Sequence, residues 1–176
     1  MNIFVLDNNP KIAAMDMDDV RVPKMCVESA QMMASALRRH GATDSMMPLT
    51  KAGTPYKGGH KHHPCTVWAG DTRYNFEWLA SHAKELCFQY FLRFGKTHAC
   101  EAPIKEMTKL KYVIYPEKVN HNKNAGMTPF AQAMPDEYKD KDAVKAYRNY
   151  SQSKVNSKGG VKYVRRIPPS WWEAII

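Results

Sequence analysis

The chain has 176 residues, with 26 lysines and arginines against 17 aspartates and glutamates, which gives a formal net charge of +9 and a pI near 9.4. Its hydrophobic share of 44% and aromatic share of 11% exclude a wholly disordered chain, although the mean hydropathy of -0.56 is polar. The length suits one domain with its own core, and the positive charge favours a nucleic-acid partner.

Membrane and export signals are not visible in the sequence. There is no run of about 18 apolar residues and no amphipathic helix with lysines along one side, so we expect no membrane partner. Residues 1–7 are apolar and strand-like, without the basic start and small-residue cleavage site of a signal peptide. We therefore expect the protein to act in the cytoplasm.

The first third of the chain predicts a short apolar segment followed by two helices. Residues 2–6 are apolar, and residues 10–18 have room for one or two helical turns. Pro23 then lies in the first turn of a helix that we expect to end before Gly41, because proline is favoured at helix starts and glycine after helix ends.

A polar row with a single carboxylate runs along this second helix. Its members share one helical face by their spacing, whereas the other faces are mainly apolar. A lone carboxylate with basic neighbours is a plausible catalytic group. The alternative is that the row simply faces water. The row consists of Arg21, Lys24, Glu28 and Gln31.

A long basic loop is expected from Thr43 to His63, since this stretch combines glycines, a proline and several lysines. A loop of this length in a compact domain is often functional. Residues 60–65 (HKHHPC) contain residue types that bind zinc. We nevertheless expect no metal, because alternating histidines point in different directions and the neighbouring lysines repel a dication.

Helical patterns dominate the middle of the chain. Asp71 or Thr72 is expected to cap the strongest helix, which ends at Gly95. A weaker helical pattern covers residues 101–110. A connection rich in Tyr, Pro and Asn then extends to Gly126.

In the C-terminal part we expect a short helical start at residues 128–129 and a helix from Asp140. The composition becomes basic after Ser151. The final Trp pair is suited either to stack on bases or to anchor the C-terminus to the core. We expect a mainly α fold: a single compact helical domain with long loops, formed by a helical core in residues 1–152, and a basic, aromatic-ended C-terminal arm in residues 153–176 packed on it.

Several enzyme classes lack their sequence signatures. The four cysteines are scattered without a CxxC pair, so we expect reduced thiols and no structural zinc. None of them has the signature of an activated nucleophile. Gly58-Gly59 is not followed by a phosphate-binding helix start of the GK[ST] type, which excludes nucleotide hydrolysis of that kind. We expect neither a metal nor another cofactor.

Four segments of the first 98 residues carry a family resemblance. In chain order they are residues 6–7 (LD), 21–24 (RVPK) with Glu28 and Gln31, 62–68 (HHPCTVW) and 92–95 (LRFG). Together they resemble the pyrimidine dimer DNA glycosylase family, the endonuclease V-like group, over roughly residues 1 to 98. Beyond that range, residues 129–135 (PFAQAMP) and the final Trp pair are similar to a phage-encoded branch of such proteins.

The resemblance implies a compact DNA repair enzyme that cleaves the glycosidic bond of a damaged pyrimidine and then nicks the abasic strand. In the family the N-terminal α-amine attacks the sugar C1′ to form a Schiff base, and a glutamate near the start of the chain assists. An α-amine has a pKa of about 7.7 to 8.0, so a useful fraction is neutral and nucleophilic near neutral pH. A carboxylate beside the sugar stabilises developing positive charge and moves a proton.

Carried over to this chain, the glutamate corresponds to Glu28, and Arg21 and Lys24 would hold phosphates around the lesion. Known phage members begin with a small residue after methionine removal, whereas this chain has Asn2. We therefore expect Met1 to be retained and its own amine to serve as the nucleophile. The catalytic interpretation predicts that the N-terminal nitrogen lies within about 4 to 6 Å of the Glu28 carboxylate.

Further contacts with double-stranded DNA are expected from the polar row, the loop and the arm. The alternative role for His63 is to cap a helix. Trp68 is a further candidate for such a contact, and its alternative role is packing in the core. We expect a monomer, located in the host cell cytoplasm if the protein is phage-encoded. The expected DNA contacts are Gln31, His63, Arg73, Lys162, Arg165 and Arg166.

Two other classes of function stay open. A non-catalytic nucleic-acid-binding phage protein would need only the basic charge and the terminal aromatic residues. A phage protein that binds a host protein would use its charge mainly for solubility. Substitution of Glu28 and binding to anionic columns distinguish these classes from the enzyme.

Overall fold

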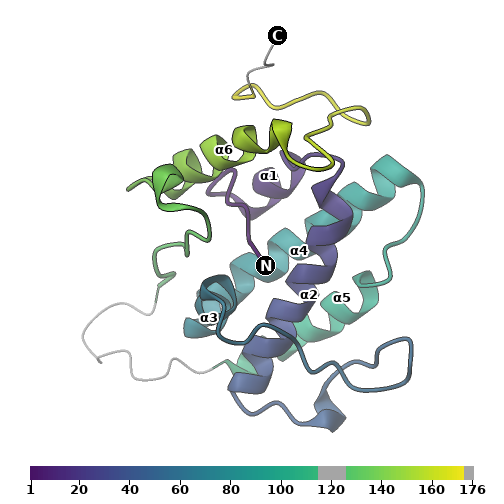
Figure 1. Ribbon diagram of the computed structural model, residues 1–176. Helices are drawn as coiled ribbons and strands as arrows, with labels where there is room; N and C mark the ends of the chain where they lie inside the picture. Colours follow the sequence, from purple (N-terminus) through teal and green to yellow (C-terminus); the bar gives the residue numbers. More distant parts are fainter. Residues whose placement is uncertain (115–125, 173–176) are drawn as a thin grey trace.

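The computed structural model describes residues 1–114 and 126–172 (Figure 1). These residues form six α-helices and no strand, apart from one isolated bridge between Leu49 and Pro55. The prediction of a mainly α, single helical domain is confirmed. Most of the predicted connection before Gly126 lies outside the described residues. Within the described ranges, each helix is too short or too polar to cross a lipid bilayer.

The two predicted early helices are present as α1 (Pro10–Met15) and α2 (Arg21–Arg39). The side chain of Asn9 caps α1 by accepting a hydrogen bond from the backbone N–H of Lys11. α2 contains Pro23 in its first turn and ends before Gly41, as expected. Residues 2–6 do not form a strand but a buried, irregular segment.

The predicted long helix is α4 (Arg73–Phe94), capped by the Thr72 side chain and ended by Gly95 in the left-handed conformation, with φ of 65°. It is preceded by α3 (Pro64–Asp71), which no helical pattern predicted and which the sequence indicated only through the alternative role of His63 as a helix cap. α3 is only 8 residues long and apolar on most sides, so it lacks the polar face that makes a helix recognisable.

The last two helices are α5 (Glu101–Lys109) and α6 (Ala143–Ser153). The prediction that α6 begins at Asp140 was wrong by three residues, because Asp142 caps the helix by accepting hydrogen bonds from the backbone N–H groups of Val144 and Lys145. Residues 126–135 contain no helix.

The helix α4 is the centre of the core and packs against α1, α2, α3 and α5. The N-terminal segment passes between this group and α6, and its end lies beside the middle of α2 (Figure 1). Ile3 and Val5 are fully buried there, while Phe4 lies against Tyr147 of α6. This packing of residues 1–6 brings the start of the chain to the polar row of α2.

Candidate active site

The N-terminal amino group lies against Glu28 in the middle of α2. The nitrogen of Met1 is 3.7 Å from Glu28 Oε2, and the backbone N–H of Asn2 donates a hydrogen bond to the same oxygen at 2.9 Å. Glu28 is only 9% exposed, so the alternative that the whole polar row faces water does not hold for this residue. The separation is slightly shorter than the 4 to 6 Å predicted above.

The second oxygen of Glu28 faces a surface cation. Lys24 Nζ lies 3.3 Å from Oε1, one turn earlier on α2, and the Lys24 side chain is 72% exposed. The carboxylate is therefore placed between the α-amino group and an ammonium group at the surface. A negatively charged ligand that approaches this surface would meet Lys24 first.

The side chain of Asn2 holds the N-terminal residues in this place. Its Oδ1 accepts hydrogen bonds from the backbone N–H groups of Ile3 and Phe4, at 2.7 and 3.2 Å, and its Nδ2 donates to the carbonyl of Ala133 at 2.9 Å. Phe4 has a φ of 39°, an uncommon conformation for a side chain of its size. Because these hydrogen bonds stabilise the turn, Asn2 positions the amine against Glu28.

His63 lies near the same group, at the start of α3. Its Nδ1 accepts a hydrogen bond from the backbone N–H of Cys65 at 3.2 Å, so the capping role considered for it is present. Burial lowers the pKa of His63, and the positive N-terminal amine lowers it further, which favours the neutral imidazole that this cap requires. Its pKa therefore responds to the same amine that contacts Glu28.

Cys65, the second residue of α3, is a buried thiol near the N-terminus. Burial raises its pKa to about 11, and its Sγ lies 3.9 Å from the hydroxyl of Tyr147. A thiol with so high a pKa is almost wholly protonated at neutral pH and is a poor nucleophile. Of the two groups, the amine is therefore the better candidate for a nucleophile beside Glu28.

Arg21 uses its guanidinium within the protein. Its Nη1 donates to Asp18 Oδ2 at 2.8 Å and to the carbonyl of Gly160 at 3.2 Å, and the side chain is only 13% exposed. The residue thus joins the start of α2 to the C-terminal arm. Gln31 is half-buried one turn after Glu28. Arg73 begins α4 and donates to the carbonyl of Tyr112 at 3.5 Å.

The arm, residues 153–172 in the structure, packs on the turn between α1 and α2. The carbonyl of Lys162 accepts from the backbone N–H of Asp19 at 2.8 Å. Arg165 donates to the carbonyl of Arg93 at 3.0 Å, and Arg166 Nη2 lies 3.7 Å from Asp16 Oδ1. The side chains of Arg165 and Arg166 therefore have partners inside the protein, whereas the exposed Lys162 side chain forms no ion pair with any described residue.

Trp171 has the anchoring role that was one of the two alternatives for the final Trp pair. Its Nε1 donates to Asp16 Oδ2 at 2.7 Å, and the Arg148 guanidinium lies 5.1 Å from its ring. Burial raises the pKa of Asp16, an effect opposed by the hydrogen bond from Trp171. The arm is thereby fixed at both of its ends.

Two parts of this region were missed from the sequence. One is the clamp formed by the Asn2 side chain, for which a short polar residue at the start of the chain is the only local signal. The other is the continuation of the polar row beyond Gln31 to Ser35 and Arg38, which repeat the spacing of three and four residues. That spacing was visible and would have extended the row.

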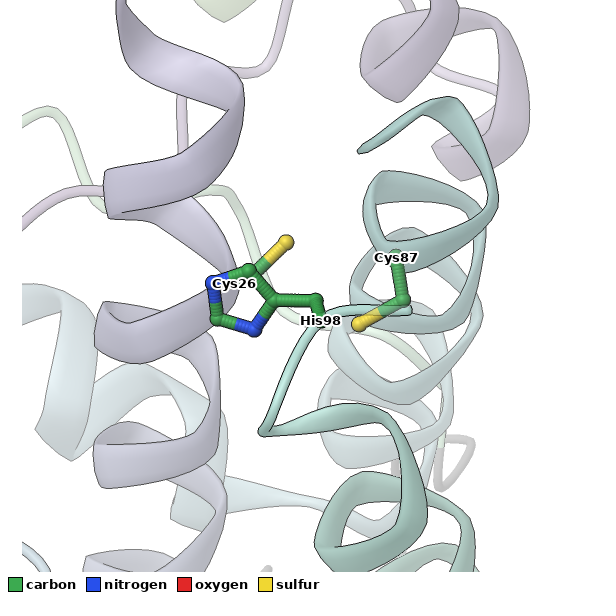
Figure 2. Close-up of side chains that lie close together, drawn as sticks. All are labelled: Cys26, Cys87 and His98. Carbon is green, nitrogen blue, oxygen red and sulfur yellow. The ribbon is translucent and has the colours of Figure 1, made fainter. Parts of the chain in front are cut away.

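Cys26, Cys87 and His98 form a separate group, in which the potential ligand atoms all lie within 4.8 Å of one another (Figure 2). One nitrogen of the imidazole already has a partner, because Nδ1 accepts a hydrogen bond from the backbone N–H of Cys100 at 3.1 Å. A hydrogen bond to Cys87 and burial raise the pKa of the Cys26 thiol. These contacts fit protonated core thiols better than metal ligands, and all four cysteines are free and buried.

The fold and the site define a mainly helical protein in which an α-amino group is held against a buried glutamate. Comparisons of the chain with models of protein families, with curated proteins and with solved structures found no match.

Proposed function

We propose that the protein is a DNA glycosylase with abasic-site lyase activity that acts on damaged or modified pyrimidines. The observation that carries this proposal is the 3.7 Å separation between the nitrogen of Met1 and Glu28 Oε2. An amine beside a buried carboxylate is the arrangement that Schiff-base chemistry at a sugar requires. The resemblance of residues 1–98 to the pyrimidine dimer glycosylases and the net charge of +9 support the same conclusion.

In the proposed first step, Glu28 takes a proton from the α-ammonium group, and the neutral amine attacks C1′ of the sugar. The bond from C1′ to the base nitrogen breaks, and the base leaves with the electron pair and takes up a proton. The bond from C1′ to the ring oxygen then opens, the oxygen is protonated, and an iminium ion links the sugar to the protein. The Glu28 carboxylate stabilises the positive charge that develops at C1′.

The proposed lyase step uses the same iminium ion. Loss of a proton from C2′ leads to cleavage of the bond between C3′ and its oxygen, and the 3′ phosphate leaves with the electron pair. Water then hydrolyses the Schiff base and releases the amine. Lys24, at the exposed side of Glu28, is placed to contact a phosphate of the bound strand.

Borohydride trapping tests this proposal, because hydride reduces the iminium ion to a stable amine. Labelled duplexes with an abasic site or a pyrimidine dimer would be incubated with the wild type, with Glu28→Gln and with Glu106→Gln, an exposed control on α5. The intact mass of the protein would first establish whether Met1 is present. We expect adducts on both duplexes for the wild type and the control, and loss of dimer cleavage for Glu28→Gln.

The other classes of function are outcomes of the same experiment. Duplex binding without any adduct would overturn the enzymatic proposal and favour a non-catalytic nucleic-acid-binding protein. Absence of both adduct and DNA binding at modest salt would favour a protein that binds a host protein partner.

A further inference from the structure

A cavity of about 630 Å³ lies between α2, the loop of residues 57–62 and the start of α3. Its volume is in the range of pockets that bind small molecules. Six of its lining residues have basic side chains, and among the described residues that line it none is acidic. The six are Arg38, Arg39, Lys57, His60, Lys61 and His62.

The loop that forms one wall of the cavity is fixed to α2 by Ser35. Ser35 Oγ accepts a hydrogen bond from the N–H of Gly59 at 2.9 Å and lies 3.0 Å from the Gly59 carbonyl oxygen, to which it donates. Gly58 has a φ of 80°, and a Cβ atom there would lie 2.2 Å from Ser35 Oγ, so only glycine allows this approach. The cavity wall is therefore built in advance of any ligand.

Thr66 lines the cavity and has an unpaired hydroxyl group. The residue is only 3% exposed, and its Oγ1 has no hydrogen-bond partner within the described part of the chain. A buried hydroxyl without a partner is unfavourable, so such groups are rare unless a ligand or water completes them. Thr66 lines the cavity, and rotation about its χ1 angle would turn the hydroxyl, which is enclosed by protein atoms, toward a ligand oxygen there.

The charges around the cavity differ in how far they are already neutralised. Arg38 contacts Asp44, and Arg39 lies 2.9 Å from Asp71. Lys57 and Lys61 are exposed and form no ion pair with any described residue. The cavity thus offers hydrogen-bond donors and uncompensated positive charge, which together suit an anion with several acceptor oxygens.

We propose that this cavity binds the phosphate group of a nucleotide, either free or within a nucleic-acid strand. Ser35 follows Glu28 by two helical turns on the same face of α2, which places the cavity about 10 Å further along the helix at about 1.5 Å per residue. A strand that places a sugar at Glu28 would extend toward this cavity. The choice of a nucleotide as the ligand rests on the proposed function.

Two variants test whether binding depends on this cavity or on the basic charge of the protein in general. Thr66→Val removes the hydroxyl while keeping the shape, and the pair Lys57→Gln with Lys61→Gln removes the free charge. Lys51→Gln is the matched control, because Lys51 is an exposed lysine earlier in the same basic stretch that does not line the cavity.

Binding would be measured by titration calorimetry with a deoxynucleoside monophosphate, with inorganic phosphate and with a short undamaged single strand. We expect affinity to fall about tenfold for Thr66→Val, with an unchanged or higher melting temperature, and at least as far for the double variant. Binding of the monophosphate would identify a free nucleotide as a sufficient ligand, and binding of the strand alone would identify strand phosphates. Wild-type affinity in both variants, or no binding of any probe, would overturn the proposal.

Trapping on the abasic duplex makes the two proposals distinguishable. Adducts with the wild type, combined with normal binding by Thr66→Val and the double lysine variant, would remove the cavity assignment alone. Phosphate binding that depends on Thr66, without any adduct, would remove the glycosylase and leave the cavity as a phosphate site.

Discussion

The arginines of the C-terminal arm and the lysines of the loop of residues 57–62 are both basic, but they differ in their partners within the protein. In the arm, Arg165 donates to a backbone carbonyl and Arg166 lies near Asp16. In the loop, Lys57 and Lys61 form no ion pair with any described residue. The acidic residues of the turn between α1 and α2 account for this difference, because they contact the arm and not the loop.

Asp19 is the centre of the contacts that hold the arm. Its carboxylate accepts from the backbone N–H groups of Val164 and Arg165, at 2.8 and 2.9 Å, and lies 3.2 Å from the guanidinium of buried Arg93. A net charge of +9 therefore indicates a binding surface only where the basic side chains have no partner within the protein. By this criterion the exposed lysines of the loop and of the arm, and not the arginines of the arm, are the stronger candidates for contacts with nucleic acid.

Asp19→Ala should have the largest effect on the stability of the protein, because Asp19 is the centre of the contacts that hold the arm. It leaves the Arg93 guanidinium buried without its counter-ion, which is expected to lower the free energy of unfolding by about 3–5 kcal/mol. Asp44→Ala, which removes the exposed partner of Arg38, should lower it by less than about 1 kcal/mol. Urea denaturation measures both, and equal small losses would contradict the structural role of Asp19.

Gly58→Ala tests the fixed shape of the loop. A left-handed backbone costs about 1–3 kcal/mol for a residue with a Cβ, and the clash with Ser35 adds to this, so we expect a loss of about 2–4 kcal/mol. Gly53→Ala is the matched control, because Gly53 has a similar φ of 76° but open space around its Cβ position. The same loss in both variants would show that the contact with Ser35 contributes nothing.

His82, in the core, should make the free energy of unfolding depend on pH, with an effect of intermediate size. It is fully buried, and desolvation lowers its pKa to about 3. An unfolded histidine takes up its proton near pH 6.5, so below that pH the unfolded state binds more protons and stability falls. From pH 7.5 to pH 5 we expect this residue to reduce the free energy of unfolding by about 2 kcal/mol.

The variant that checks this expectation is His82→Leu, measured by urea denaturation at both pH values. It should lose about 2 kcal/mol less than the wild type as the pH is lowered. An equal decline in both proteins would assign the acid sensitivity to other groups.

The smallest expected effect is on the salt dependence of DNA binding, which compares the loop lysines with Arg165 of the arm directly. Lys57→Gln and Lys61→Gln should each reduce the slope of log K against log salt by about 0.9, the value for one phosphate contact. Arg165→Gln should change the slope little, because its guanidinium already has a partner in the protein. A larger reduction from Arg165 than from the lysines would return the arm to the DNA interface, as first expected from the sequence.

The elements with strong local signals were predictable. Pro23, Thr72 and Gly95 marked the ends of α2 and α4, because caps and proline act within one helical turn. No helical pattern predicted the short helix α3, since a brief apolar segment has no distinguishing periodicity. Asp142 and Asp140 both resemble caps in sequence, and only the structure shows which one accepts the hydrogen bonds.

The site was predictable in its residue types but not in its burial. The spacing along α2 identified Glu28, yet nothing within one helix indicates which distant segment covers it. That segment is the start of the chain, held by a hydrogen bond from Asn2 to the carbonyl of Ala133, 131 residues away. The pairing of the arm with Asp16 and Asp19 is equally remote in sequence, so the arm was assigned to DNA on its charge alone.

Mapping the trapped adduct tests the central claim most directly. The wild-type protein would be reduced with borohydride on an abasic duplex and digested with trypsin and nuclease, and the modified peptide would be identified by mass spectrometry. We expect the sugar remnant on the α-amine of the peptide of residues 1–11, which ends at the first lysine of the chain. An adduct on a lysine side chain, or no adduct, would contradict an N-terminal amine acting with Glu28.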